Sequence, residues 1–338
     1  MKKKIHSLNE LKEAFRQSAL ATGLEVSEAG HYAEAVASFD TLKDFSALDT
    51  RSKSMVRISY YMYGKQLQHE GNFSEASRCF SRAKEIYPDD ILILERTKLF
   101  DSHCRYKTWE NIAEFRKCFG FGFTSGGYDK YKYPFLEIAK EKGILEESQL
   151  ASPSKLIDSL HTIGTYRIQA QGRHLLSYKI REYKGKHPYS SANPALALPF
   201  AWLLADFIKS KTELVRFVDV IVPSPSNPEN YVARGFVPSL LIGQKLSKCL
   251  AVPYRELFSV TPMPCRFRDM TYSEAKKLIR FREKRYDKIV SGNRLLLMDD
   301  VITTGTTLTL LADLLKSAGA RAVYAVALAK TGVSKEGS

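Results

Sequence analysis

One stretch near the C-terminus restricts the fold of the surrounding chain more than any other. The four apolar residues Leu295–Met298 are too few for a helix and predict a buried strand. Asp299 and Asp300 follow that strand directly, and a loop of small residues comes next. The run 308–318 is typical of a helix, and the run 322–328 is typical of a second buried strand. The stretch therefore predicts a strand–helix–strand unit of an α/β fold with a mainly parallel sheet.

The loop between this strand and the helix has the composition of an anion-binding loop. Backbone N–H groups at a helix N-terminus lack intrahelical partners and attract anions, and Gly305 allows a ligand to approach closely. Asp299 and Asp300 would repel a phosphate, so they need vicinal sugar hydroxyls or a hydrated Mg²⁺ as partners. The ligand implied is a ribose 5-phosphate group, and the alternative is an ordinary loop beside a solvated acid pair. The hydroxyl donors of the loop are Thr303, Thr304, Thr306 and Thr307.

The segment from Leu295 to Thr307 resembles the phosphoribosyl pyrophosphate (PRPP) loop of type I phosphoribosyltransferases. Both have an apolar run, two acids, two aliphatic residues and then Thr-Thr-Gly-Thr-Thr. The resemblance implies that Asp299, Asp300, Val301 and the loop residues bind PRPP. It also implies that the two acids are catalytic and hold Mg²⁺, directly or through water.

A weaker resemblance covers about residues 164–332. A predicted strand at 217–222 ends in Pro-Ser-Pro and leads to Arg-Gly-Phe at 234–236. This order is similar to that of the competence protein F (ComF) family of phosphoribosyltransferase-like proteins. PRPP has a pyrophosphate on C1, and Ser224 and Arg234 are the candidates to bind it. ComF-type proteins commonly begin with a four-cysteine zinc ribbon; this sequence lacks one, and we expect no zinc.

Residues 266–288 form a basic segment ahead of the acid pair. Nine Lys or Arg and four Asp or Glu give it a local net charge of +5. Arg266 and Arg268 stand where the ComF family has a flexible loop, so the resemblance assigns them a catalytic role over the pyrophosphate. For Arg280 to Arg285 the pattern favours a surface helix. A surface that contacts nucleic acid is the alternative for the whole segment.

The first part of the chain, residues 1–120, is predicted to be helical and repetitive. The stretch 30–39 recurs 41 residues later as 71–80, with Gly, an aromatic residue, Glu, Ala and Phe at the same offsets. This resembles the tetratricopeptide repeat (TPR), whose usual period is about 34, so we expect an insertion at 41–52. A third unit is expected over 91–119. The resemblance implies a concave surface for a protein partner; the alternative is a helical spacer or dimerisation element.

Two further regions complete the predicted organisation. Residues 121–160 are expected to connect the domains and to contain short helices at 133–142 and 153–160. Residues 161–338 are expected to form the phosphoribosyltransferase-like domain. The alternating pattern around 166–180 predicts a β-hairpin at its start.

Composition narrows the classes of partner. The net charge of +14 favours phosphorylated metabolites or nucleic acid. The longest apolar run, 195–205, contains Pro199 and is too short to cross a bilayer. The five cysteines are odd in number and never spaced as Cys-x-x-Cys, which indicates neither a disulfide framework nor a zinc site. We therefore expect a cytoplasmic protein without a membrane partner.

Two functions fit these patterns. The first is an Mg²⁺-dependent phosphoribosyltransferase that releases pyrophosphate from PRPP and serves an unidentified acceptor, with nucleobases among the candidates. The second is a non-catalytic sensor of PRPP or a nucleotide, whose TPR-like domain binds a protein or nucleic-acid partner. By resemblance alone, the second fits a role in DNA uptake, DNA processing or defence. The sequence leaves open whether the protein is an enzyme.

Overall fold

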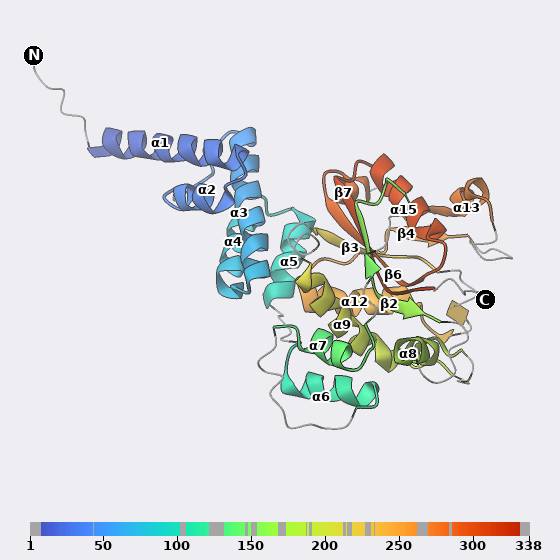
Figure 1. Cartoon of the computed structure of the whole chain (residues 1–338). Helices are drawn as coiled ribbons and strands as arrows, with labels where there is room; N and C mark the ends of the chain where they lie inside the picture. The colour runs from blue at the N-terminus through green and yellow to red at the C-terminus, as the bar shows by residue number, and fades with distance from the viewer. Residues whose placement is uncertain are drawn as a thin grey trace, which may run out of the picture. The chain divides into compact units, whose positions relative to one another are not determined.

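The structure is a computed structural model of the chain, shown in Figure 1. It divides into two compact units, Met1–Ser102 and His103–Ser338, which we describe separately. No helix among the described residues is long and apolar enough to cross a membrane. The residues described are 8–42, 44–101, 106–121, 132–145, 148–149, 154–167, 174–186, 188, 191–211, 214, 218–226, 231–232, 234–261, 270–283 and 286–331.

The N-terminal unit consists of helices that pack against their neighbours along the chain. Helix α1 packs on α2 and helix α3 packs on α4, which also contacts α5. The bounds of these helices are α1 (Leu8–Glu28), α2 (Tyr32–Phe39), α3 (Thr50–Glu70), α4 (Phe73–Ile86) and α5 (Ile91–Asp101).

Each of the two helix pairs, α1 with α2 and α3 with α4, contains one close contact between a glycine and a phenylalanine. A Cβ atom added to Gly23 would lie 2.4 Å from Cε1 of Phe39, and one added to Gly64 would lie 2.8 Å from Cε1 of Phe80. Both phenylalanine side chains are fully buried. Each contact therefore needs a residue without a side chain, and the 41-residue repeat in the sequence corresponds to two equivalent helix pairs.

We expect Gly64→Ala to lower the free energy of unfolding of the helical unit by about 1–2 kcal/mol. The methyl group would overpack the buried ring of Phe80, and this cost exceeds the gain of up to about 1 kcal/mol in helix propensity. Urea unfolding followed by circular dichroism would measure the change. Phe80→Leu should recover part of the loss in the double variant, and strict additivity of the two changes would contradict the contact.

The unit boundary and the third repeat differ from the sequence prediction. Helix α6 (Trp109–Cys118) belongs to the C-terminal unit, because Ile112 and Phe115 lie in its hydrophobic core with Phe135 and Phe200. The boundary between the units along the chain consequently falls after Ser102, whereas the sequence pattern predicts a boundary near residue 120. The third repeat expected over 91–119 is wrong, since α5 and α6 fall in different units.

The C-terminal unit is built on a five-stranded sheet in the order β1-β2-β7-β6-β3. Strand β1 is antiparallel to β2, and β2, β7, β6 and β3 run parallel. The predicted α/β domain with a mainly parallel sheet is confirmed. The strands are β1 (Ser148–Gln149), β2 (Ser159–Tyr166), β3 (Val220–Pro223), β6 (Arg294–Ile302) and β7 (Ala322–Thr331).

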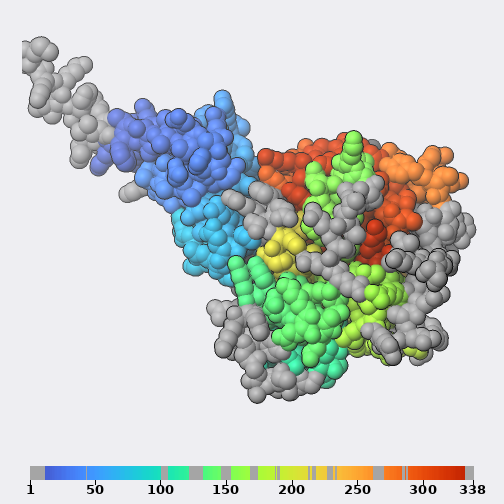
Figure 2. Space-filling view, viewed as in Figure 1, coloured from blue at the N-terminus to red at the C-terminus, as the bar shows by residue number. Residues whose placement is uncertain are grey.

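Helices cover the sheet according to the alternation of its side chains. Leu296 and Met298 of β6 belong to the core formed with α9 and α12. Leu295 and Leu297 are equally buried but lie outside that core cluster, and α15 packs on the neighbouring strand β7 (Figure 1). In the space-filling view, the surface near residue 160 (green) lies beside the C-terminal elements (red), as the pairing of β2 with β7 requires (Figure 2). The bounds of these helices are α9 (Ala197–Ser210), α12 (Pro238–Leu250) and α15 (Thr306–Ser317), and α7 (Pro134–Glu141) is a further helix of this unit.

The β-hairpin predicted around 166–180 is wrong, because its second half is helix α8 (Leu175–Lys184). Leu176, Ile180 and Tyr183 recur at helical spacing and are all fully buried. The helix ends at Gly185, whose φ of 60° suits the left-handed conformation of a C-cap.

The helix predicted at 153–160 is also wrong. Residues 154–158 form a turn that leads into β2. Asp158 donates its backbone N–H to the carbonyl of Val323 at 2.8 Å, and its carboxylate accepts the N–H of Val323 at 2.7 Å. These hydrogen bonds to β7 therefore hold residue 158 in line with strand β2, and they outweigh the helical propensity of residues 153–160.

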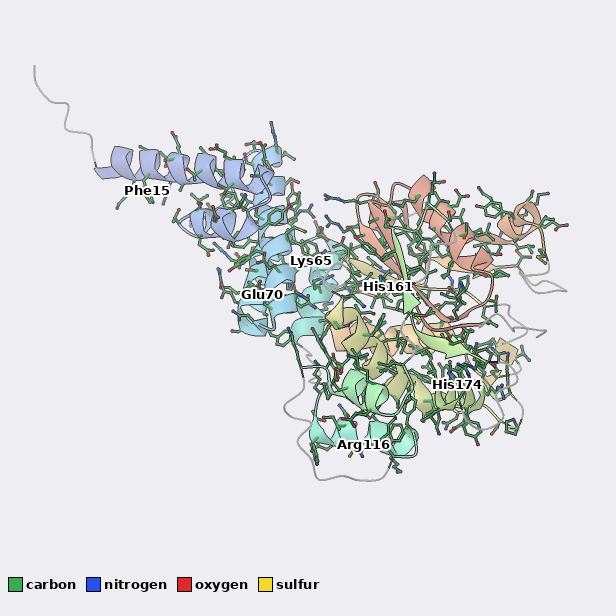
Figure 3. All side chains as sticks on the ribbon, in the orientation of Figure 1. Phe15, Lys65, Glu70, Arg116, His161 and His174 are labelled. Atoms are coloured by element: carbon green, nitrogen blue, oxygen red, sulfur yellow. The ribbon has the colours of Figure 1, made fainter. Side chains whose placement is uncertain are left out.

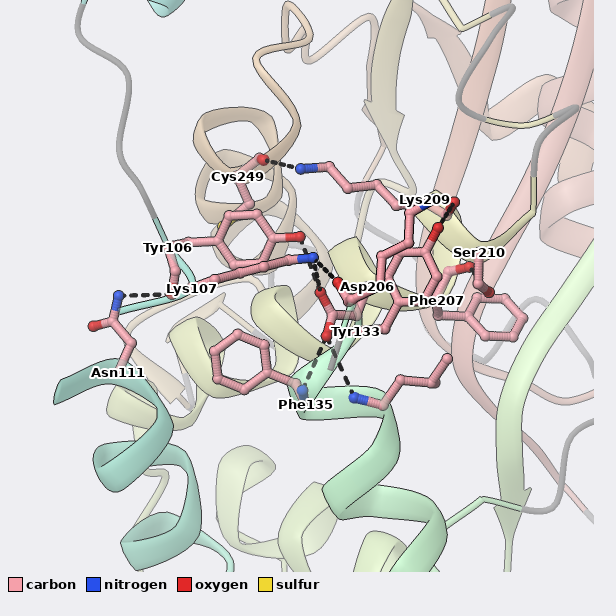
Figure 4. A network of polar contacts seen from close by, with 12 residues as sticks. Tyr106, Lys107, Asn111, Tyr133, Phe135, Asp206, Phe207, Lys209, Ser210 and Cys249 are labelled. Carbon is pink, nitrogen blue, oxygen red and sulfur yellow. Dashed lines mark hydrogen bonds and ion pairs between the residues drawn. The ribbon is translucent and has the colours of Figure 1, made fainter. Parts of the chain in front are cut away.

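A buried polar cluster joins the chain ahead of α6 and α7 to α9 (Figure 4). Asp206 of α9 is fully buried and accepts the hydroxyl of Tyr106 at 3.0 Å and the N–H of Phe135 at 2.9 Å. The ammonium of Lys107 lies 3.4 Å from the same carboxylate. Burial raises the pKa of Asp206, and the charge of Lys107 opposes that rise. The carboxylate of Asp206 thus connects the segment ahead of α6 and the start of α7 to helix α9.

Candidate functional site

The acid pair lies at the carboxyl end of β6, beside the end of β3. Pro223 is the register partner of Met298, and the N–H of Ser224 donates to the carbonyl of Met298 at 2.8 Å. The structure thus brings Ser224 and the acid pair together, as expected for a ligand site outside the carboxyl ends of parallel strands. Asp299 and Asp300 are both half-buried.

The two carboxylates are oriented by the backbone of their own segment. An oxygen of Asp299 accepts the N–H of Asp300 at 2.8 Å. An oxygen of Asp300 accepts the N–H of Val301 at 2.6 Å. Each acid therefore has one oxygen fixed by a backbone N–H of the next residue.

Burial raises the pKa of the Asp299 carboxyl to about 7, and the charge of Asp300 acts in the same direction. The ammonium of Lys184 and the hydroxyl of Ser224 act against that rise. Ser224 is itself only 2 % exposed. Two adjacent, half-buried carboxylates are costly to ionise together, so the pair suits a cation or several hydroxyl donors.

The threonine loop follows directly and begins helix α15. Gly305 is buried, has a φ of 81° and stands at the N-cap without a side-chain cap. The hydroxyl of Thr304 lies 2.9 Å from the hydroxyl of Thr306. It also accepts the backbone N–H of Thr306 at 3.4 Å. Thr303 and Thr304 are exposed, and Thr306 and Thr307 are half-buried. This geometry is compatible with an anion at the start of α15, and the assignment of a phosphate to it stays a prediction.

The sequence patterns missed Lys184. Its ammonium lies 2.7 Å from a carboxylate oxygen of Asp300, and the two side chains are 12 % and 13 % exposed. The predicted β-hairpin covered residues up to about 180, so the sequence patterns did not place Lys184 at the end of a helix. The signal in the sequence was the spacing of Leu176, Ile180 and Tyr183, followed by the helix-ending Gly185.

A cavity of about 550 Å³ lies beside the loop that follows β3, residues 224–226, which we call the β3 loop. Its lining is largely apolar and aromatic, and it includes Pro223 and Pro225 on either side of Ser224. The β3 loop thus contributes both to this cavity and to the surroundings of Asp299. The lining residues are Pro223, Pro225, Ser226, Tyr231, Gly235, Phe236, Val237, Leu240, Leu241, Gln244, Glu256, Phe258, Ser259, Val260 and Arg282.

The basic segment is only partly helical. Helix α13 (Tyr272–Leu278) leads into β5 (Ile279–Phe281), which pairs antiparallel with β4 (Phe258–Val260). Arg280 therefore lies on a strand, and the surface helix expected from Arg280 onwards is wrong there. Arg282 pairs with Glu256 at 2.9 Å at the edge of the cavity. Pairing of β5 with β4 replaced the helical continuation.

Three of the predicted arginines remain unassigned. Arg266, Arg268 and Arg285 lie outside the described residues. Arg234 is half-buried ahead of α12, and its contact with pyrophosphate stays a prediction.

The described residues contain no group of three or more His, Cys, Asp or Glu side chains that could hold a metal ion. Figure 3 shows His161 on β2 and His174 ahead of α8. His161 packs against the ring of Phe207 at 6.2 Å, and Nδ1 of His174 lies 2.7 Å from the hydroxyl of Ser177. Both histidines thus have structural contacts on separate elements.

One comparison with known protein families covers the segment that contains the acid pair. Residues 265–337 match the family model described as the phosphoribosyl transferase domain. The matched range contains β6, the threonine loop, α15 and β7. No curated protein matches the chain. The match supports a similarity of the C-terminal part of the chain to type I phosphoribosyltransferase-like domains.

Proposed function

We propose that the C-terminal unit binds PRPP together with Mg²⁺ and transfers its 5-phosphoribosyl group to an acceptor. The observation that supports this most is the placement of the acid pair and the threonine loop. Asp299 and Asp300 lie near the carboxyl end of the parallel strand β6, and Gly305 is the N-cap of the next helix in a left-handed conformation. The hydroxyls of a ribose would meet the acids while its 5-phosphate meets the loop.

The residues present fit a hard cation, because carboxylate oxygens are the protein ligands that Mg²⁺ prefers. Asp299 and Asp300 would hold it, directly or through water. Bound Mg²⁺ would neutralise charge on the departing pyrophosphate. Ser224 and Arg234 would position that pyrophosphate next to the β3 loop, and Arg266 and Arg268 would cover it.

Catalysis in this proposal consists of positioning and electrostatic stabilisation. The bond from C1 of the ribose to pyrophosphate breaks as the acceptor forms a bond to C1, so no covalent intermediate with the protein is required. Charge develops on the leaving pyrophosphate and on the sugar ring. Donors fixed before the reaction stabilise that charge without reorganisation.

Two measurements on the full-length protein test the proposal. Isothermal titration with PRPP, with and without Mg²⁺, measures binding, and a coupled assay measures pyrophosphate release against a panel of nucleobases. We expect PRPP to bind in the micromolar range and to require Mg²⁺. No binding of PRPP or ribose 5-phosphate at millimolar concentration would exclude the proposal.

The second candidate is a PRPP or nucleotide sensor with a TPR-like partner-binding domain. It is favoured by the two equivalent helix pairs of the N-terminal unit, whose glycine–phenylalanine contacts repeat with the 41-residue period. Stacked helix pairs of this kind form concave surfaces that bind proteins. PRPP binding without pyrophosphate release for any acceptor would favour the sensor over the enzyme.

A further inference from the structure

Lys184 is the last residue of α8, and the fold holds its position firmly. The hydroxyl of the preceding Tyr183 donates to the carbonyl of Pro238 at 2.9 Å, which ties the end of α8 to the start of α12. A Cβ atom added to Gly185 would lie 2.6 Å from the backbone nitrogen of Ala192. A lysine at a helix C-terminus is also favoured by the helix dipole. The backbone of Lys184 is therefore held beside Asp300, while its side chain can exchange one anionic partner for another.

This ion pair occupies the acid that a ligand would need. One oxygen of Asp300 accepts the N–H of Val301, and the other lies 2.7 Å from the ammonium of Lys184. One oxygen of Asp299 already accepts a backbone N–H. A divalent cation approaching this site would meet a neutralised Asp300 with a positive charge beside it, and both conditions oppose binding.

PRPP changes that balance in two ways. Its pyrophosphate and 5-phosphate bring oxygen ligands for a metal ion that the acid pair alone lacks. The same phosphates offer the ammonium of Lys184 a strong anionic partner when it leaves Asp300. The ribose hydroxyls could then donate to the carboxylates that Lys184 releases.

We propose that Lys184 is a positioning residue that occupies Asp300 in the ligand-free site and makes divalent-cation binding depend on PRPP. Mg²⁺ then enters together with PRPP and not before it. This inference rests on the proposed PRPP site. It adds a binding order and assigns it to one side chain.

The test is a titration of the full-length protein with Mn²⁺ in the absence of PRPP. Electron paramagnetic resonance measures the free and bound Mn²⁺ at each point of the titration. We expect weak binding to the wild type and at least about tenfold tighter binding to Lys184→Met, because removing the ammonium frees Asp300. Lys179→Met is the matched control. It removes the same charge from α8, but Lys179 pairs with Glu182 at 2.8 Å. We expect its Mn²⁺ affinity to equal that of the wild type.

Two further variants assign the effect. Adding Asp300→Asn to Lys184→Met should return Mn²⁺ affinity to the weak wild-type level, and Lys184→Arg should retain that level. A folded Lys184→Met protein with Mn²⁺ affinity within twofold of the wild type would overturn the proposal. Tight Mn²⁺ binding by the wild type that Asp300→Asn abolishes would also overturn it, and that measurement does not depend on the folding of Lys184→Met.

The Mn²⁺ measurements and the PRPP measurements fail separately. If the wild type does not bind PRPP, the proposed function falls, whereas the Mn²⁺ titration still shows whether Lys184 occupies Asp300. If PRPP binds but leaves the Mn²⁺ affinity of the wild type unchanged, the binding order falls and the PRPP site stands. We expect PRPP to raise that affinity at least about tenfold, by supplying phosphate oxygens.

Discussion

Replacing both Asp299 and Asp300 with Asn is expected to weaken PRPP binding at least about 100-fold. Each carboxylate would lose hydrogen bonds or metal contacts that are worth about 1.5–3 kcal/mol when one partner is charged. Isothermal titration with PRPP and Mg²⁺ measures the loss. Unchanged PRPP affinity in the double variant would show that the acid pair does not bind the ribose.

The fold should survive this double substitution. Burial raises the pKa of Asp299, so a neutral amide there removes the cost of its charge, and this gain opposes the loss of the contact between Asp300 and Lys184. Leu297→Ala is the contrasting variant on the same strand. Leu297 is fully buried, and its truncation is expected to cost about 2–5 kcal/mol of unfolding free energy. Thermal unfolding of both variants separates loss of the ligand site from loss of the domain.

The sequence predicted the acid pair and its sheet because the relevant signals are local. Leu295–Met298 form a continuous apolar run, and a strand buried on both faces requires such a run. Gly305 and Gly319 mark the two ends of α15, and both have positive φ angles in the structure. Turn, strand and helix signals all lie within one short stretch, so no distant contact was needed to interpret them.

The errors arose where distant contacts decide the structure. Residues 175–180 alternate enough to suggest a strand, but packing against β2 and α12 places Leu176, Ile180 and Tyr183 on one helical face. Asp158 pairs with Val323, which is remote in the sequence. The ion pair of Lys184 with Asp300 likewise joins two distant segments, and no local pattern could show it.

Asp206→Ala is expected to lower the unfolding free energy of the C-terminal unit by about 3–5 kcal/mol, the range for breaking a buried ion pair from one side. The substitution leaves the hydroxyl of Tyr106 and the N–H of Phe135 without their acceptor. It also leaves the ammonium of Lys107 without the carboxylate at 3.4 Å. Urea unfolding would measure the loss, and Asp206→Asn should lose less because its amide oxygen still accepts hydrogen bonds.

Asp313→Ala provides the matched control for this substitution. Asp313 pairs with the exposed Lys276 at 2.5 Å and accepts the hydroxyl of Tyr272 at 3.0 Å. Exposed ion pairs contribute at most about 1 kcal/mol, so this variant should stay close to the wild type. Equal losses for the Asp206 and Asp313 variants would contradict the role of the buried cluster.

The cost of Asp206→Ala should fall as the pH rises from 7 through about 8. Burial lowers the pKa of the neighbouring Lys209 to about 8, and the charge of Asp206 opposes that shift. Without Asp206 the pKa of Lys209 in the folded protein falls further below its value in the unfolded chain, so the charged ammonium costs the variant more than the wild type. That extra cost is present at pH values where Lys209 is still charged in the folded wild type, and it disappears above about pH 8, where the amine is neutral in both folded proteins. Unfolding measured at pH 7 and at pH 9.5 should show the difference between wild type and variant shrinking, and a constant difference would exclude Lys209 from the cluster.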